Sequence, residues 1–147
     1  MSAPTAHESN PYLRTEAAGS LLVELRRSTD GRTGDRLSTV IRAVTTAGST
    51  LPPDQVEAAI AAIALLLAEY EPGLLDGAAD ESALREWLHD VDTELTPGRR
   101  LAATAALARI ELGLNNEWYD AHRHAGTLPS ALATLRRLRN GLADAAG

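Results

Sequence analysis

The stretch that decides the fold spans residues 52–70 and reads PPDQVEAAIAAIALLLAEY. Proline suits the first turn of a helix, because the N–H that it lacks has no partner there. The larger apolar residues that follow recur every three or four positions, which is the period of a helix: Val56, Ile60, Ile63, Leu67 and Tyr70. Alanine and leucine fill most of the remaining positions. A helix that is apolar on most sides is usually a central one, so we expect this segment to lie at the core of a helical fold.

Helical periodicity continues on both sides of this segment, and no strand-length run of β-branched or aromatic residues occurs. Capping residues, prolines and glycines predict six further helices, over residues 15–28, 35–47, 81–93, 97–113, 115 or 116 to 125, and 128 onward. No heptad persists long enough for a coiled coil. We therefore predict an all-α fold: one compact orthogonal bundle of about six to seven helices. It forms a single domain over residues 1–147, with flexible ends at about 1–10 and 144–147.

The apolar stripes of two of these helices bear on which face is buried. In the segment 97–113, one apolar stripe consists of Leu101, Ala105, Ala108 and Leu112, and a second consists of Leu107 and Ile110. In the segment 81–93, Trp87 shares a stripe with Leu84, Leu88 and Val91, so we expect Trp87 in the core.

Composition excludes several classes of protein. The chain has 147 residues and no cysteine, which rules out a disulfide framework, a cysteine-based zinc site and a thiol nucleophile. It has no run of 18 apolar residues and no charged-then-apolar N-terminal layout, so we expect a cytoplasmic protein without a membrane span or secretory signal. Glycine loops of the phosphate-binding type and a nucleophile-elbow serine are also missing from the sequence.

The charge is unevenly distributed along the chain. The net charge is −6, yet the segment 54–94 holds eleven acidic residues against Arg85 alone. Such a field speeds the association of a basic partner. The leading hypothesis is therefore a protein-binding module, in the manner of an immunity protein or antitoxin that masks a basic protein. We expect its contacts at Asp76, Asp80, Glu81, Asp90 and Asp92. The alternative is an acidic surface that only keeps the protein in solution.

A polar and aromatic cluster at residues 115–124 supports a second hypothesis. On a helix, Glu117, Asp120 and His124 share one face, where they could serve acid/base chemistry. A small-molecule-binding protein or a metal-independent enzyme would use Tyr12, Glu117, Tyr119 and His124. The spacing is not a strong metal signature, and the sequence implies no cofactor. The simpler interpretation is an amphipathic helix with Trp118 or Tyr119 in the core.

A third hypothesis concerns nucleic acid, which Arg123, Arg136, Arg137 and Arg139 could grip through phosphates. The overall acidic charge argues against it. Salt bridges from these arginines to the acidic segment are the simpler interpretation.

Two stretches resemble a known family. They are residues 10–25 (NPYLRTEAAGSLLVEL) and residues 106–126, which contain ALARI, NNEWYD and a closing AG. Together they resemble a bacterial family of small helical proteins classified as a domain of unknown function, whose members open with Trp-Gly-x-Gly-Pro-Phe-Asp-Asn-Asp. The matching residues are Pro11, Tyr12, Ala17, Ala18, Glu24, Asn115, Glu117 and Tyr119.

This sequence departs from the family where His7, Glu8 and Asn10 replace Trp, Gly and Gly, and where residues 13–15 replace the acidic turn. His122 stands at a position where tryptophan is common. The resemblance implies an all-helical fold over roughly residues 7–142. It does not point to any particular activity, because the family has none firmly assigned.

Overall fold

A computed structural model of the chain describes residues 10–28, 31–46 and 48–146. These residues form seven α-helices and one short 3₁₀ helix, η2. The elements are α1 (Glu16–Arg27), α2 (Thr33–Thr46), α3 (Pro53–Leu67), η2 (Pro72–Leu75), α4 (Glu81–Asp90), α5 (Pro97–Leu112), α6 (Glu117–Ala125) and α7 (Leu128–Ala146). The described ranges contain no strand, only an isolated pairing of Leu51 with Asn116. The predicted all-α bundle is confirmed.

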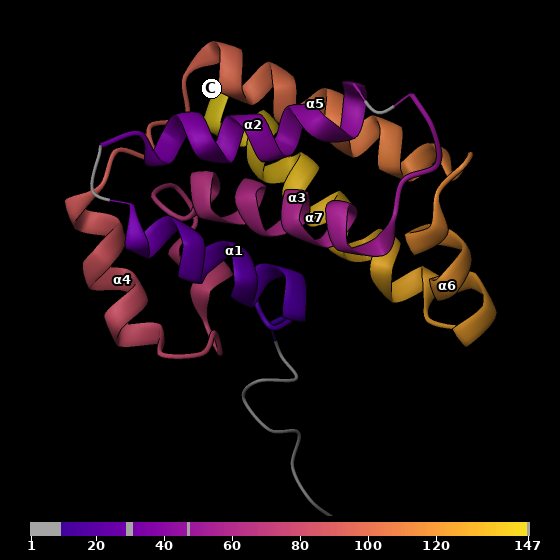
Figure 1. Cartoon of the computed structure of the whole chain (residues 1–147), viewed down its shortest axis with the longest axis horizontal. Coiled ribbons are helices and arrows are strands. Elements are labelled where there is room, and N and C mark those ends of the chain that lie inside the picture. Colours follow the sequence, from indigo (N-terminus) through magenta and orange to yellow (C-terminus); the bar gives the residue numbers. More distant parts are fainter. Residues whose placement is uncertain (1–9, 29–30, 47, 147) are drawn as a thin grey trace, which may run out of the picture.

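Helix α3 lies at the centre of the bundle, as its apolar surface predicts. Every residue from Ala59 to Leu67 is buried. Such a helix needs partners on all sides, and α3 packs against α1, α2, α5, α6, α7 and η2. Figure 1 shows α3 between α2 above it and α1 below it, with α7 behind, and with α4 and α6 at opposite ends of the bundle. The two ends of the molecule are therefore available for separate roles.

Most helix starts follow local sequence rules. Thr15, Thr96 and Asn116 each accept a hydrogen bond from the backbone N–H three residues further on, at 2.9–3.1 Å. These bonds satisfy N–H groups that a first turn leaves unpaired. At the other end of helices α5 and α6, Gly113 and Gly126 adopt positive φ angles of 74° and 76° and end the helix.

Some helix ends differ from the sequence prediction. Helix α3 stops at Leu67, and the N–H groups of Tyr70 and Glu71 both donate to the Leu67 carbonyl. Tyr70 therefore leaves the stripe to which periodicity assigned it and is 51% exposed. Helix α4 ends at Asp90, three residues early, because Val91 is extended. Helix α2 begins at Thr33, two residues early, and its predicted last residue, Ala47, lies outside the described residues.

The buried face of α5 is the second of the two stripes that the sequence offered. Ala103, Ala106, Leu107 and Ile110 are buried. The other stripe, Leu101, Ala105, Ala108 and Leu112, is exposed. The reason is tertiary: α5 packs mainly against α2 and α7, and these neighbours cover only one side. Trp87 of α4 was predicted to lie in the core. It is only half-buried and packs against the outside of the core cluster.

The described residues at both ends, Asn10 and the end of α7, belong to the fold, whereas the rest of the predicted flexible ends, residues 1–9 and 147, lies outside the described residues. Asn10 is buried at 3% exposure. Its Nδ2 donates to the carbonyls of Leu74 (3.0 Å) and Asp76 (2.8 Å), and its Oδ1 accepts from the N–H groups of Tyr12 and Leu13. These bonds fasten the start of the fold to η2. At the other end, α7 continues to Ala146.

Arg99 joins α5 to α2 and to the segment that precedes it. Its guanidinium donates to the Glu94 carbonyl (2.7 Å) and to Asp35 (3.1 Å), and its side chain is only 12% exposed. The guanidinium lies against Gly34, where an added Cβ would meet it at 2.5 Å. Glycine at that position therefore allows the two helices to be linked.

Candidate partner-binding recess

A recess of about 590 Å³ opens at the α4 end of the bundle. Its walls come from the end of α3, from η2, from α4 and from residues 91–94, which follow α4. The early ends of α3 and α4 create this space, since both segments turn away where the sequence predicts continuing helix. The volume falls within the range of about 300–1,000 Å³ that is typical of ligand pockets.

The recess combines apolar and acidic lining residues. Leu65, Ala68, Leu75 and Leu88 supply apolar lining, while Glu69, Asp92 and Glu94 supply three carboxylates. Arg85 and His89 also line it. An apolar lining with carboxylates suits a long side chain with a cationic head, because the methylene stem and the charged end both find matching surroundings.

Arg85 does not offset these three carboxylates, because it is already paired with two other acids. Its guanidinium contacts Asp76 at 2.9 Å and Glu81 at 3.0 Å, and it donates to the Pro72 carbonyl. The N–H of Gly77 also donates to the Glu81 carboxylate at 2.9 Å. That bond, with the bond from Arg85, holds the pKa of Glu81 below its ordinary value. This group braces the turn between η2 and α4.

Of the lining carboxylates, Asp92 has a weak internal partner. Arg99 approaches it at 3.9 Å, a distance well beyond that of the Arg99 bond to Asp35. The Asp92 side chain remains 59% exposed. One of its oxygens accepts from the Glu94 N–H at 3.1 Å and shapes the turn after α4. Glu69 and Glu94 have no ion pair among those found in the described residues.

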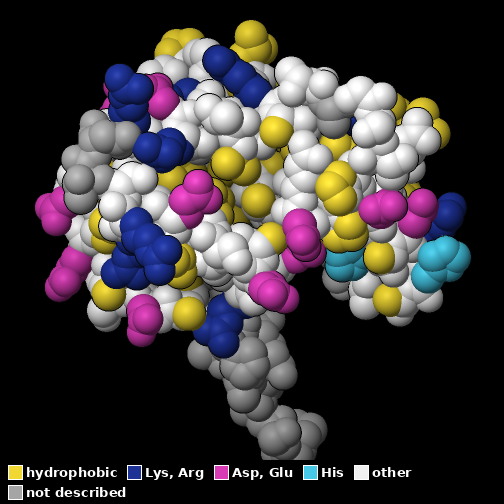
Figure 2. All heavy atoms as spheres, viewed as in Figure 1, with side chains coloured by type: hydrophobic (Ala, Val, Ile, Leu, Met, Phe, Trp, Pro, Cys, Tyr) yellow, Lys and Arg dark blue, Asp and Glu magenta, His cyan; other side chains and the backbone are white. Residues whose placement is uncertain are grey.

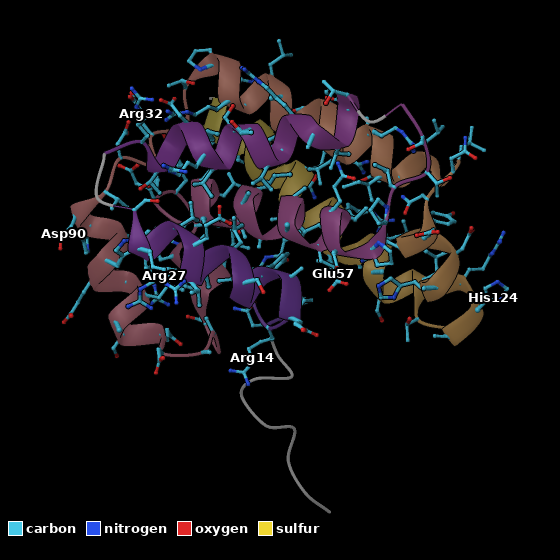
Figure 3. All side chains as sticks on the ribbon, in the orientation of Figure 1. Arg14, Arg27, Arg32, Glu57, Asp90 and His124 are labelled. Carbon is cyan, nitrogen blue, oxygen red and sulfur yellow. The ribbon has the colours of Figure 1, made fainter. Side chains whose placement is uncertain are left out.

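The five residues predicted to contact a basic partner are thus divided among three environments. Asp92 lines the recess, Asp76 and Glu81 hold Arg85, and Asp80 and Asp90 lie exposed at the two ends of α4. Asp80 precedes the helix in a left-handed conformation with φ of 51°. Figure 3 shows Asp90 at the α4 end of the molecule.

Glu69 and Glu94 were not singled out from the sequence, although both belong to the acidic segment. They are 25 residues apart along the chain, and only the fold brings the segment after α3 and the segment after α4 to the same recess. Had the sequence predicted that α3 ends at Leu67, Glu69 would have been expected in the turn after the helix. No other local feature of the sequence points to Glu69.

The alternative ligand site is distributed over two parts of the molecule. Tyr12 is buried, and the Arg137 guanidinium of α7 lies 5.9 Å from its ring centroid. Burial raises the pKa of the Tyr12 hydroxyl, and Arg137 partly opposes this. Glu117 and His124 are exposed on α6. None of the three recesses described for the structure has Tyr12, Glu117, Tyr119 or His124 in its lining.

Helix α6 follows the simpler, amphipathic interpretation. Trp118 is buried at 5% exposure, and its ring meets that of His122 edge-on at 4.6 Å. Burial lowers the pKa of His122, whose Nδ1 lies 2.7 Å from the Thr127 hydroxyl. His124 points away from the bundle at the end opposite to Asp90 (Figure 3).

The arginines considered for nucleic-acid binding are largely paired. Arg137 contacts Glu71 of the acidic segment at 3.5 Å, Arg123 contacts Asp120 at 3.1 Å, and Arg139 pairs with Glu111. Only Arg136 has no ion pair among those found in the described residues, and it is exposed. Within the same ranges, no three His, Asp or Glu side chains are grouped so as to hold a metal ion.

No family model, curated protein or solved structure gives a significant match to this chain. The family resemblance therefore stays a prediction. None of the described helices is long and apolar enough to cross a membrane.

Proposed function

We propose that this chain is a protein-binding module that receives a basic side chain or segment of a partner protein in the recess beside α4. The observation that carries the proposal is the lining of that recess. Glu69, Asp92 and Glu94 lie around an apolar space, and the nearby Arg85 is held by two other carboxylates.

The charge of the surrounding surface supports the same partner class. Glu86 and Asp90 are exposed on α4, so a cation that approaches this end meets additional negative charge. Such a field increases the rate of encounter with a basic protein. Masking a basic surface in this way is the mode of action of immunity proteins and antitoxins, and it needs no catalytic group.

Helix α4 is suited to adapt to a partner. Leu84 is its one buried residue, while Trp87 and Leu88 are half-buried. A helix held by few buried apolar side chains opens at a lower free-energy cost than a central one. We therefore expect α4 to adjust more readily than α3 when a partner binds.

The test uses a capped tetra-arginine peptide and the isotope-labelled full chain, observed by NMR at low salt. We expect chemical-shift changes at residues 68–75 and 85–94, and weaker binding as salt screens the charges. The variant Glu69→Gln with Asp92→Asn and Glu94→Gln keeps the shape of the recess, and we expect it to lose about tenfold in affinity. Shift changes centred on α6 would instead favour the ligand site around Glu117 and His124.

A matched control removes the same number of charges elsewhere. Glu16, Glu24 and Asp144 are exposed and lie outside the recess. Replacing these three by their amides is expected to change the affinity by less than about twofold. If both triple variants lose affinity equally, the binding depends on net charge alone and the recess has no specific role. The same pair of variants then serves as bait in a pull-down, in which a true partner is retained by the control and lost by the recess variant.

A further inference from the structure

Helix α5 presents an apolar face that no part of the described chain covers. Leu101 is 72% exposed and Leu112 is 62% exposed, and Ala105 and Ala108 between them are also exposed. The spacing of four, three and four residues places all four side chains in one row along the helix. Figure 2 shows hydrophobic side chains along the upper edge of the molecule, where α5 lies.

We propose that a second copy of this chain covers this face, so that two α5 helices pack antiparallel about a two-fold axis. In an antiparallel pair centred between Ala105 and Ala108, Leu101 lies opposite Leu112 of the other copy. Ala105 lies opposite the other copy's Ala108. The row is therefore complementary to itself: small side chains at the centre let the helices approach, and leucines close both ends. A two-fold interface requires this kind of self-complementarity.

The charges beside the row favour the antiparallel arrangement. Arg100 and Glu111 lie on the same flank, about 20° apart around the helix axis by the helical period. In the antiparallel pair, Arg100 comes within roughly one turn of Glu111 of the other copy, and symmetry forms this pair twice. In a parallel pair, a two-fold axis along the helices would instead place the two Arg100–Glu111 flanks on opposite sides of the interface, so neither opposite-charge pair would form.

The groups involved are available for such contacts. Arg100 has no ion pair among those found in the described residues. Glu111 uses Oε2 for its own Arg139, which leaves Oε1 for the other copy. Arg109, on the opposite flank, is occupied by the carbonyls of Leu114 and Asn115. A flank that carries one charge of each sign suits a second copy better than a uniformly basic or acidic partner.

The dimer is expected to be weak. A helix of 16 residues is roughly 24 Å long, and one helix pair of that length buries less than the ~800 Å² per partner of a standard interface. Sedimentation velocity of the full chain from about 10 µM to 1 mM, a range that brackets micromolar affinity, should show a reversible monomer–dimer equilibrium.

Substitutions on the face test where the contact lies. Leu101→Glu combined with Leu112→Glu is expected to give a monomer throughout the range, whereas Val23→Glu, at a 52% exposed position of α1, retains the dimer. Both positions of the test variant are exposed, so its thermal stability should stay unchanged. A wild-type chain that stays monomeric throughout, or a dimer that survives the double substitution, would overturn the proposal.

Charge reversal tests the antiparallel register. Arg100→Glu alone and Glu111→Arg alone each place like charges together and should weaken the dimer. Mixing the two variants restores both opposite-charge pairs, so a heterodimer should form in the mixture where each variant alone is monomeric. A mixture that stays monomeric while each variant is folded by circular dichroism would refute the antiparallel register.

Discussion

Replacing Asn10 by alanine should strongly destabilise the fold, although sequence position places this residue near a chain end. Its side chain makes four hydrogen bonds, two as a donor to the carbonyls of Leu74 and Asp76 and two as an acceptor from the N–H groups of Tyr12 and Leu13. The substitution leaves all four backbone groups without that partner. Because the two carbonyls belong to η2 and the turn after it, the variant also loosens one wall of the recess.

The magnitude follows from the burial of these bonds. Those to Leu74, Tyr12 and Leu13 are buried, while the one to Asp76 is only partly so. Each buried bond contributes about 0.5–1.5 kcal/mol net, so we expect a loss of about 3 kcal/mol in the free energy of unfolding. That is a large share of the roughly 5–15 kcal/mol that holds a typical domain together.

The assay is urea unfolding followed by circular dichroism and by the fluorescence of the two tryptophans. Asn140→Ala is the control, since that asparagine is exposed on α7 and its replacement should stay within about 0.5 kcal/mol. Asn10→Asp keeps the acceptor but turns the donor into an oxygen that faces two carbonyls. We expect it to lose stability at neutral pH and to regain part of it in acid, where a protonated carboxyl can donate again. A loss below about 1 kcal/mol for Asn10→Ala would refute the reasoning, because even one buried bond accounts for that much.

Three further predictions test the packing. Gly34→Ala should cost about 1 kcal/mol in urea unfolding, because its Cβ would meet the Arg99 guanidinium at 2.5 Å and displace it from its bonds to Asp35 and the Glu94 carbonyl. Gly19→Ala, a helical site with nothing within 4 Å, should instead stabilise by about 0.5–1 kcal/mol; equal effects would contradict this assignment. Leu107→Ala should cost about 2–5 kcal/mol in the same assay and Leu101→Ala less than about 0.5 kcal/mol, and the reverse order would mean that α5 is rotated. Burial raises the pKa of Glu57 above 4.5, so its folded form favours the proton and stability falls as pH rises through that pKa. Glu57→Gln should therefore raise the melting temperature at pH 7 and lose this advantage below pH 4.5, and a constant offset at all pH values would argue against the raised pKa.

Local rules predicted the helices because the signals act within a few residues. Thr15, Thr96 and Asn116 cap their helices through bonds that span three residues. The sequence alone found the two threonines, and it narrowed the third cap to Asn115 or Asn116. The same holds for α3, whose apolar run leaves no alternative to burial. Where the prediction was wrong, as at Tyr70, the period continued past the point at which the chain turned away.

The candidate recess was only partly visible in the sequence. The acidic segment could be counted from composition, and Asp92 was among the expected contacts. Which acids are neutralised could not be read from spacing, because Asp76 and Glu81 depend on where the Arg85 guanidinium lies. Glu69 and Glu94 became candidates only because the fold places both in the lining of one recess.

The sequence by itself determined the helical class, the central helix and the sign of the charge near α4, because periodicity, capping and composition are properties of neighbouring residues. Tertiary structure alone decided which stripe of α5 is buried. Both stripes are apolar, and the choice between Leu107 and Leu101 rests on where α2 and α7 lie. It also decided that Asn10 is an anchor, since its partners Leu74 and Asp76 lie more than sixty residues away along the chain. Contacts of that range depend on the whole arrangement of helices and leave no local periodic signal.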